Sequence, residues 1–170
     1  GDGNKVTWTI SGENNIISKW MGVFVSMDSM IGKDFEDDYS NSLQKAIVAK
    51  GLSGNVFIYG SKDDVQNIIK QSEICILTSK SEGLPVALLE YGFNKKAVVM
   101  TKVGEIANVI NEGKNGFLVE YGDVLHFTEE LSKQIISPEL RIQLGQNLHQ
   151  TIIENYSEEA VLHNYIRLLT

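Results

Sequence analysis

Short apolar runs alternate with helix-length segments through the middle of the chain, and this alternation limits the possible folds more than any other feature. Four such runs cover Val56–Tyr59, Ile74–Leu77, Ala97–Met100 and Gly116–Val119. Each run is apolar on both faces, as expected of a strand that helices cover on both sides. The repeated order of strand, helix and strand predicts right-handed βαβ units. We therefore expect an α/β fold, a three-layer, Rossmann-like, doubly wound parallel sheet.

The segments around these runs have the lengths and spacing of helices. Pro85 and Pro138 each stand at the start of one such segment, where proline is favoured. No glycine or proline follows Gly145, which favours helix up to the C-terminus. Near the N-terminus, Val6–Ile10 and Trp20–Ser26 predict two strands, but the residues before about 30 give no clear connection between them. The predicted helices cover residues 38–50, 64–71, 85–93, 105–111, 123–136, 138–155 and 157–170.

Length and charge narrow the class of protein. The 170 residues predict one domain over 1–170 with a single hydrophobic core. Asp and Glu number 22 and Lys and Arg 15, so the net charge is −7. The basic residues are scattered, which argues against nucleic acid and anionic membrane as partners of this domain.

Other features of the sequence predict a protein of the reducing cytoplasm and a chain that is part of a longer protein. The single cysteine, Cys75, cannot form an internal disulfide and is expected in the core, and no Cys/His cluster has metal-ligand spacing. No apolar run reaches the roughly 18 residues that span a bilayer, and no signal peptide is recognisable, so we expect a cytoplasmic protein. Since residue 1 is Gly1 and not Met, we expect the chain to be a piece of a longer protein.

The loop over residues 79–85, after the second apolar run, is the first place to look for chemistry. Ligands of parallel sheets bind outside the carboxyl ends of the strands. Gly83 allows close backbone approach, and Pro85 begins a helix whose leading N–H groups have no partner within the helix. These donors and the helix dipole favour a phosphate group. By itself the pattern also fits an ordinary connection between a loop and a helix.

Two glutamates make a ligand site the stronger interpretation. Glu90 lies in the apolar stretch Val86–Tyr91, which predicts a helix buried on all sides, and a buried carboxylate needs polar partners. An ionised carboxylate can accept two O–H bonds from a sugar diol. Glu82 precedes Glu90 by eight residues, which is about 12 Å along a continuous helix. This separation fits a ligand with a ribose at one end, phosphates over the helix start and a second sugar beyond.

An ordered set of segments around these glutamates resembles a known family. The chain is similar to the C-terminal, donor-binding half of the retaining, group 1 (family 4) glycosyltransferases, which have the GT-B fold. The resemblance covers roughly residues 31–169. The segments that carry it are GLSGNVFIYG, SEICILTS, SEGLPVALLE, TKVGEIANVINEGKNGFLV, SPELRIQLGQN and NYSEE.

The resemblance implies that the domain holds a nucleotide-diphosphate sugar as donor substrate, with no metal or cofactor required. A hexose would be transferred with retention of configuration to a glycan or lipid-linked acceptor, as in polysaccharide or lipopolysaccharide assembly. The acceptor site would lie on an N-terminal domain absent from this chain, so the chain alone would be inactive. The full enzyme would associate peripherally with the cytoplasmic face of a membrane.

The resemblance also implies a role for individual residues. Glu82 would be the catalytic residue that contacts hydroxyls of the transferred sugar, and Glu90 would accept the ribose hydroxyls. The other implied donor-binding residues are Gly83, Leu84 and Pro85 beside the sugar or phosphates, Gly60, Ser61 and Lys62 beside the base, and Gly104 in the next loop after a strand.

One departure from the family keeps other functions open. Family members usually carry an Arg and a Lys after the first strand of this domain, whereas residues 11–19 contain one basic residue, Lys19. Lys19, Lys62 and Lys102 are either substitutes for these cations or solvated surface lysines. The alternatives are a non-catalytic nucleotide-binding or interaction domain and half of a nucleotide-sugar epimerase or phosphorylase. The second alternative calls for a histidine after a strand, whereas all three histidines fall in predicted helices.

Overall fold

The computed structural model describes residues 5–10, 23–28, 33–58 and 64–169. Contacts within the chain divide it into two compact units, Gly1–Thr78 and Ser79–Thr170, which are described in turn. The expectation of one domain over residues 1–170 stays a prediction.

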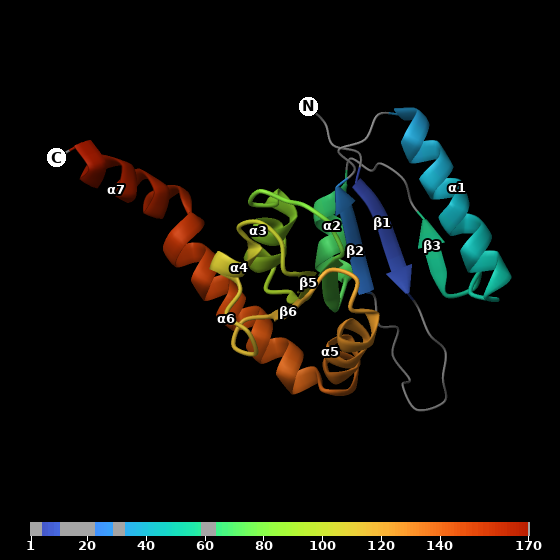
Figure 1. The fold of residues 1–170 in the computed structure, drawn as a ribbon. Coiled ribbons are helices and arrows are strands. Elements are labelled where there is room, and N and C mark those ends of the chain that lie inside the picture. The colour runs from blue at the N-terminus through green and yellow to red at the C-terminus, as the bar shows by residue number, and fades with distance from the viewer. Residues whose placement is uncertain (1–4, 11–22, 29–32, 59–63, 170) are drawn as a thin grey trace. The chain divides into compact units, whose positions relative to one another are not determined.

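The described part of the first unit contains four strands. Strand β1 runs in the direction opposite to β2 and β3 (Figure 1). Strand β2 pairs with β4 in parallel, in a register that places Val23 opposite Ile74. Strand β1 pairs antiparallel with both β2 and β3. The antiparallel β1 departs from the expected all-parallel sheet, because an antiparallel neighbour can be reached by a shorter connection than a parallel crossover requires. The strands are β1 (Lys5–Ile10), β2 (Val23–Asp28), β3 (Val56–Ile58) and β4 (Ile74–Leu77).

The helices described in the first unit are α1 (Lys33–Ala49) and α2 (Val65–Gln71). Helix α1 begins before the expected residue 38, so the acidic run of residues 34–38 forms its first turns. Acidic residues there favour the positive end of the helix dipole. Strand β4 is buried along its whole length, and its Cys75 is fully buried, as expected of a core residue.

The second unit contains the parallel pair β5 and β6, in a register that places Val99 opposite Phe117. Helix α6 packs against α3, α5 and β5 and is followed directly by α7 (Figure 1). Asp123 caps α5 by accepting a hydrogen bond from the His126 N–H, as its position before the helix predicts. The elements are α3 (Val86–Phe93), β5 (Ala97–Thr101), α4 (Ile106–Val109), β6 (Phe117–Val119), α5 (Val124–Ile136), α6 (Pro138–Tyr156) and α7 (Glu158–Leu169).

Helix α4 is shorter than the helix expected over residues 105–111. Ile110 is extended, with φ −86° and ψ 120°, and ends the helix. The buried side chain of Asn115 accepts a hydrogen bond from the Asn111 N–H at 2.7 Å and donates one to the Val109 carbonyl at 3.1 Å. A side chain distant from the helix thus binds backbone groups that a longer helix would use.

The core of the second unit lies between β5 and its helices. Strand β5 is buried throughout, and fully or nearly fully buried side chains from α3 and α6 pack beside it. Within the described residues, none of the helices is both long and apolar enough to cross a bilayer. The most buried side chains of α3 and α6 are Leu88, Tyr91, Leu144, Leu148 and Ile152.

Candidate functional site

Two loops after strands are joined in the second unit. We call residues 79–85 the site loop and residues 102–105 the second loop. The Thr101 hydroxyl donates a hydrogen bond to the Ser79 carbonyl at 2.7 Å. The Glu105 N–H donates one to the Gly83 carbonyl at 3.2 Å. The second loop therefore supports the backbone of the site loop.

Gly104 is required for this close approach. Its φ is +52°, and a Cβ placed on it would overlap the Glu82 carbonyl oxygen and lie 2.9 Å from the Gly83 oxygen. Any side chain at Gly104 would push the second loop away from Glu82. Gly104 therefore has a structural role in positioning Glu82, while its expected contact with a donor stays a prediction.

Gly83 differs from Gly104 in its φ and in the space around its Cα. It is exposed, its φ lies outside the left-handed region, and no described atom is within 4 Å of a Cβ built on it. Neither the packing of the unit nor the backbone conformation therefore requires glycine here. The absence of a side chain leaves the site-loop backbone open to close approach from outside.

The start of α3 suits an anion. Pro85 is the residue before the helix, buried and extended, with φ −71° and ψ 129°. Pro85 itself provides no side-chain cap, and the first turn carries no acidic residue. The positive end of the helix dipole therefore favours an anion here.

The expectation that α3 is buried on all sides was wrong. Val86 is 62% exposed and Phe93 is 42% exposed, while Leu88 and Tyr91 are fully buried. Only one side of α3 packs into the unit, because α6 covers it there. Glu90 lies one turn after Val86 and is half-buried, so its carboxylate stands at the border of the buried side. Such a position allows contact with a ligand.

Helix α6 packs closely against α3 and the residues after it. Two glycines that the sequence analysis did not single out allow this close packing. A Cβ on Gly92 would overlap Ile152, and a Cβ on Gly145 would overlap the Lys95 carbonyl. His149 Nδ1 lies 3.0 Å from the Gly92 carbonyl oxygen. The signal in the sequence was a glycine inside each of two predicted helices, which commonly marks close helix packing.

Ser79 is a further residue to which the sequence analysis gave no role in the site. Its Oγ is shielded from solvent and has no hydrogen-bond partner among the described residues. A buried hydroxyl is normally paired with protein, water or a ligand. The sequence signal was a hydroxyl residue shortly after a buried strand, at the first position of the site loop.

The remaining predicted residues are placed as follows. Glu82 and Leu84 are half-buried in the site loop. Lys102 forms an exposed ion pair with Glu120 at 3.2 Å, which fits a solvated lysine better than a free cation for a diphosphate. Three residues expected beside the base, Gly60, Ser61 and Lys62, and one candidate cation, Lys19, lie outside the described residues.

These features define an α/β fold with a candidate ligand site in the loops that follow its strands. The sequence model of the family described as "Glycosyl transferases group 1" matches residues 27–151. The match includes both glutamates and covers well over half of the 170 residues. The chain belongs to the group 1 glycosyl transferases, as its resemblance to that family predicts.

Individual relatives agree with this membership. The chain is 27% identical over 129 residues to the lipopolysaccharide core biosynthesis glycosyltransferase LpsE of Rhizobium meliloti, a match covering 76% of this chain and 38% of LpsE. The chain thus spans well under half the length of this relative.

Solved structures show the same fold. Anabaena HepE, crystallised in complex with UDP, superposes with a TM-score of 0.76 at 21% identity, covering 88% of this chain and 40% of HepE. The C-terminal domain of the group 1 family protein LpcC from Francisella tularensis gives 0.64 at 23% identity, covering 71% of this chain and 64% of that one. The fold is therefore the α/β half-domain of a GT-B glycosyltransferase, in agreement with the predicted fold class.

Proposed function

We propose that this chain is the donor-binding part of a retaining glycosyltransferase and that it holds a nucleoside-diphosphate sugar at the site loop and the start of α3. The observation that carries the proposal is the pair of half-buried glutamates, Glu82 and Glu90, on either side of a helix start whose N-cap residue is Pro85. The Anabaena HepE structure, which contains UDP, supports a uridine nucleotide.

The proposed contacts follow from the chemistry of each group. The Glu90 carboxylate accepts the two ribose hydroxyls, and the Glu82 carboxylate accepts hydroxyls of the transferred sugar. The diphosphate lies over the start of α3, against the backbone of Gly83 and Leu84 and the turn at Pro85. The Ser79 hydroxyl, which lacks a partner among the described residues, is a further donor beside it.

The proposed reaction depends on stabilising the leaving nucleoside diphosphate. Charge builds up on the diphosphate as its bond to the sugar breaks, and fixed N–H dipoles stabilise that charge without having to reorganise. Backbone donors are central to the proposal because the chain has a net charge of −7. No metal is needed in this scheme.

The acceptor belongs to the proposed whole protein. The chain spans 38% of LpsE and 40% of HepE, so we propose that a further domain carries the acceptor site. A hexose would then be transferred to a glycan or lipid-linked acceptor in the cytoplasm or at the cytoplasmic face of a membrane. Lipopolysaccharide core assembly, in which LpsE acts, is the class of pathway we propose. The chain alone would bind donor without completing transfer.

Calorimetric titration of the chain with UDP, UDP-glucose and GDP-mannose tests the proposal. Glu90→Ala is expected to weaken UDP binding by roughly 1–3 kcal/mol, the usual cost of losing hydrogen bonds to a charged group. Glu82→Ala is expected to weaken UDP-glucose binding more than UDP binding. Glu129→Ala, which removes an exposed glutamate on α5, is the matched control and should change neither.

The same titration separates the alternatives. Absence of heat with all three nucleotides would contradict the donor assignment. Binding of UDP that is equally strong for the protein and for Glu90→Ala would contradict the ribose contact. A non-catalytic nucleotide-binding domain would bind UDP and UDP-glucose with equal affinity, and Glu82→Ala would leave both unchanged.

A further inference from the structure

A second concave site lies in the second unit, outside the carboxyl ends of β5 and β6. Its volume is about 730 Å³, within the range of small-molecule sites. Lys102 follows β5, Glu120 follows β6, and helices α4 and α5 supply other walls. No residue of the site loop or of α3 lines it. The polar side chains that line it are Lys102, Asn108, Asn111, Glu112, Glu120 and His126.

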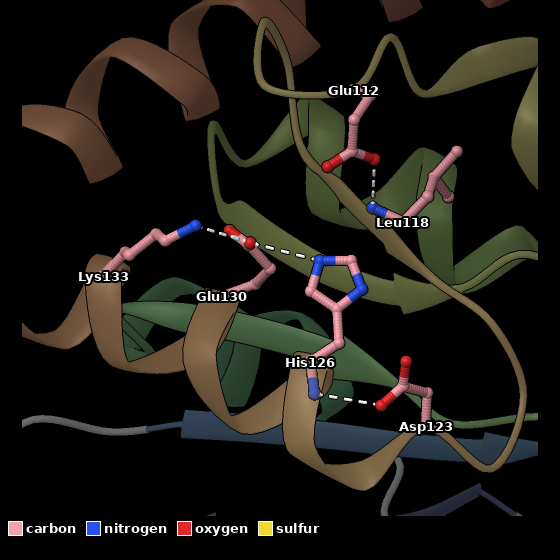
Figure 2. Close-up of polar contacts among 6 residues, drawn as sticks. All are labelled: Glu112, Leu118, Asp123, His126, Glu130 and Lys133. Carbon is pink, nitrogen blue, oxygen red and sulfur yellow. Dashed lines mark hydrogen bonds and ion pairs between the residues drawn. The ribbon is translucent and has the colours of Figure 1, made fainter.

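Two of these side chains are held in place by neighbours (Figure 2). Glu112 accepts a hydrogen bond from the Leu118 N–H at 2.7 Å. His126 Nε2 lies 3.2 Å from Glu130 Oε1, and Lys133 Nζ lies 2.6 Å from the same oxygen. The Glu130 side chain is only 6% exposed, so it is a fixed support for the imidazole ring. The cavity therefore presents a carboxylate and an imidazole that each have a neighbouring protein group as partner.

The charges around the cavity argue against an anion. Lys102 is paired with Glu120 at 3.2 Å, so its positive charge is largely compensated. Glu112 adds a further carboxylate, and like charges repel an incoming phosphate. A metal ion is also disfavoured, because no group of three or more His, Cys, Asp or Glu side chains in the described part of the chain could hold one. The charge balance therefore favours a neutral, polar ligand.

We propose that this cavity binds a neutral pyranoside, a single sugar unit without phosphate. Carboxylate and amide oxygens accept hydrogen bonds from sugar hydroxyls, and the amide and ammonium N–H groups donate to them. His126 Nε2 faces Glu130, so in the neutral ring Nδ1 accepts from a sugar hydroxyl. Ala107 and Leu118 supply apolar wall against which the C–H face of a sugar ring can pack. This site is separate from the proposed donor site and does not depend on that assignment.

Saturation-transfer NMR of the chain tests the proposal with three probes, the methyl α-pyranosides of glucose, mannose and N-acetylglucosamine. At least one is expected to receive saturation on its ring protons. Ala107→Trp places an indole in the cavity wall and is expected to lower that signal at least five-fold. Asn111→Ala removes one amide and should lower it about two-fold or more. Ala46→Trp, on an exposed position of α1, is the matched control and should leave the signal unchanged.

Several results would overturn the proposal. One is that none of the three pyranosides receives saturation. Another is that the Ala107→Trp protein melts like the wild type and still gives the full signal. A third is that glucose 6-phosphate binds more strongly than methyl glucoside. Loss of the signal in Glu82→Ala would place the sugar at the site loop and also contradict it. UDP binding reports on the donor site separately, since Ala107→Trp is expected to leave UDP affinity unchanged.

Discussion

The same substitution, glycine to alanine, is expected to have opposite effects at the two glycines of the joined loops. Gly83 lies in the site loop and Gly104 in the second loop, and each lies near Glu82. The structure gives Gly104 no space for a Cβ and Gly83 open space. Comparing the two variants therefore separates a glycine needed for folding from one that only a ligand would require.

The expected magnitudes follow from the geometry. At Gly104, a non-glycine residue with φ +52° costs about 1–2 kcal/mol, and the overlap with the Glu82 carbonyl adds about 1–3 kcal/mol. Gly104→Ala is therefore expected to destabilise the protein by about 2–5 kcal/mol. Gly83→Ala meets neither penalty and is expected to stabilise it by about 0.4–1 kcal/mol, because alanine restricts the unfolded chain.

Urea unfolding followed by circular dichroism measures the two stabilities, and calorimetric titration with UDP-glucose measures binding. Gly83→Ala is expected to retain or raise the unfolding midpoint while UDP-glucose affinity falls at least five-fold, because the new methyl group occupies the ligand's approach to the backbone. Equal midpoints for the two variants would refute the structural argument. Unchanged affinity in a stable Gly83→Ala protein would refute close approach of the ligand at this glycine.

Three further substitutions test how the second unit is held together. Asn115→Ala removes a buried amide with three hydrogen bonds and is expected to cost about 2–4 kcal/mol in urea unfolding; a loss well below 1 kcal/mol would contradict this. Gly145→Ala brings a methyl group against the Lys95 carbonyl and is expected to lower the melting temperature, and an unchanged value would contradict the packing described. A hydrogen bond with Glu130 raises the pKa of Lys133 above 10.5, so this pair stabilises the fold below that pH and loses its effect as pH rises through the raised pKa. The melting-temperature difference between wild type and Lys133→Gln should thus be larger at about pH 8 than at about pH 11.5, and a pH-independent difference would refute it.

The sequence predicts those parts of the fold whose cause is local. The predicted range of β5, Ala97–Met100, ends one residue before the observed end at Thr101. A short run that is apolar on both faces is typical of a strand covered by helices on both sides. The direction of β1 was not predictable, since it is set by backbone pairing with β2 and β3 and not by the local sequence. The end of α4 was missed for a similar reason, because the Asn115 side chain competes for its backbone groups.

The same distinction holds for the candidate site. The spacing of Glu82 and Glu90 identified the loop and helix, and the structure places both at half-buried positions. The exposure of Val86 was not predicted, because an apolar residue does not reveal whether another segment covers it. The role of Gly104 in supporting Glu82 could not be predicted, because it depends on the close approach of two loops in the folded chain. The roles of these residues toward a donor stay predictions.

The glycine contacts of α6 also restrict where the length of the chain can vary. Gly145 and Ile152 lie about two turns apart on one face of α6, against Lys95 and Gly92 respectively. Inserting one residue between Gly145 and Ile152 would rotate one contact by about 100° relative to the other, so the two could not form together. Insertions and deletions in homologous chains should therefore be rare between these positions and more common near Ser157, where α6 ends.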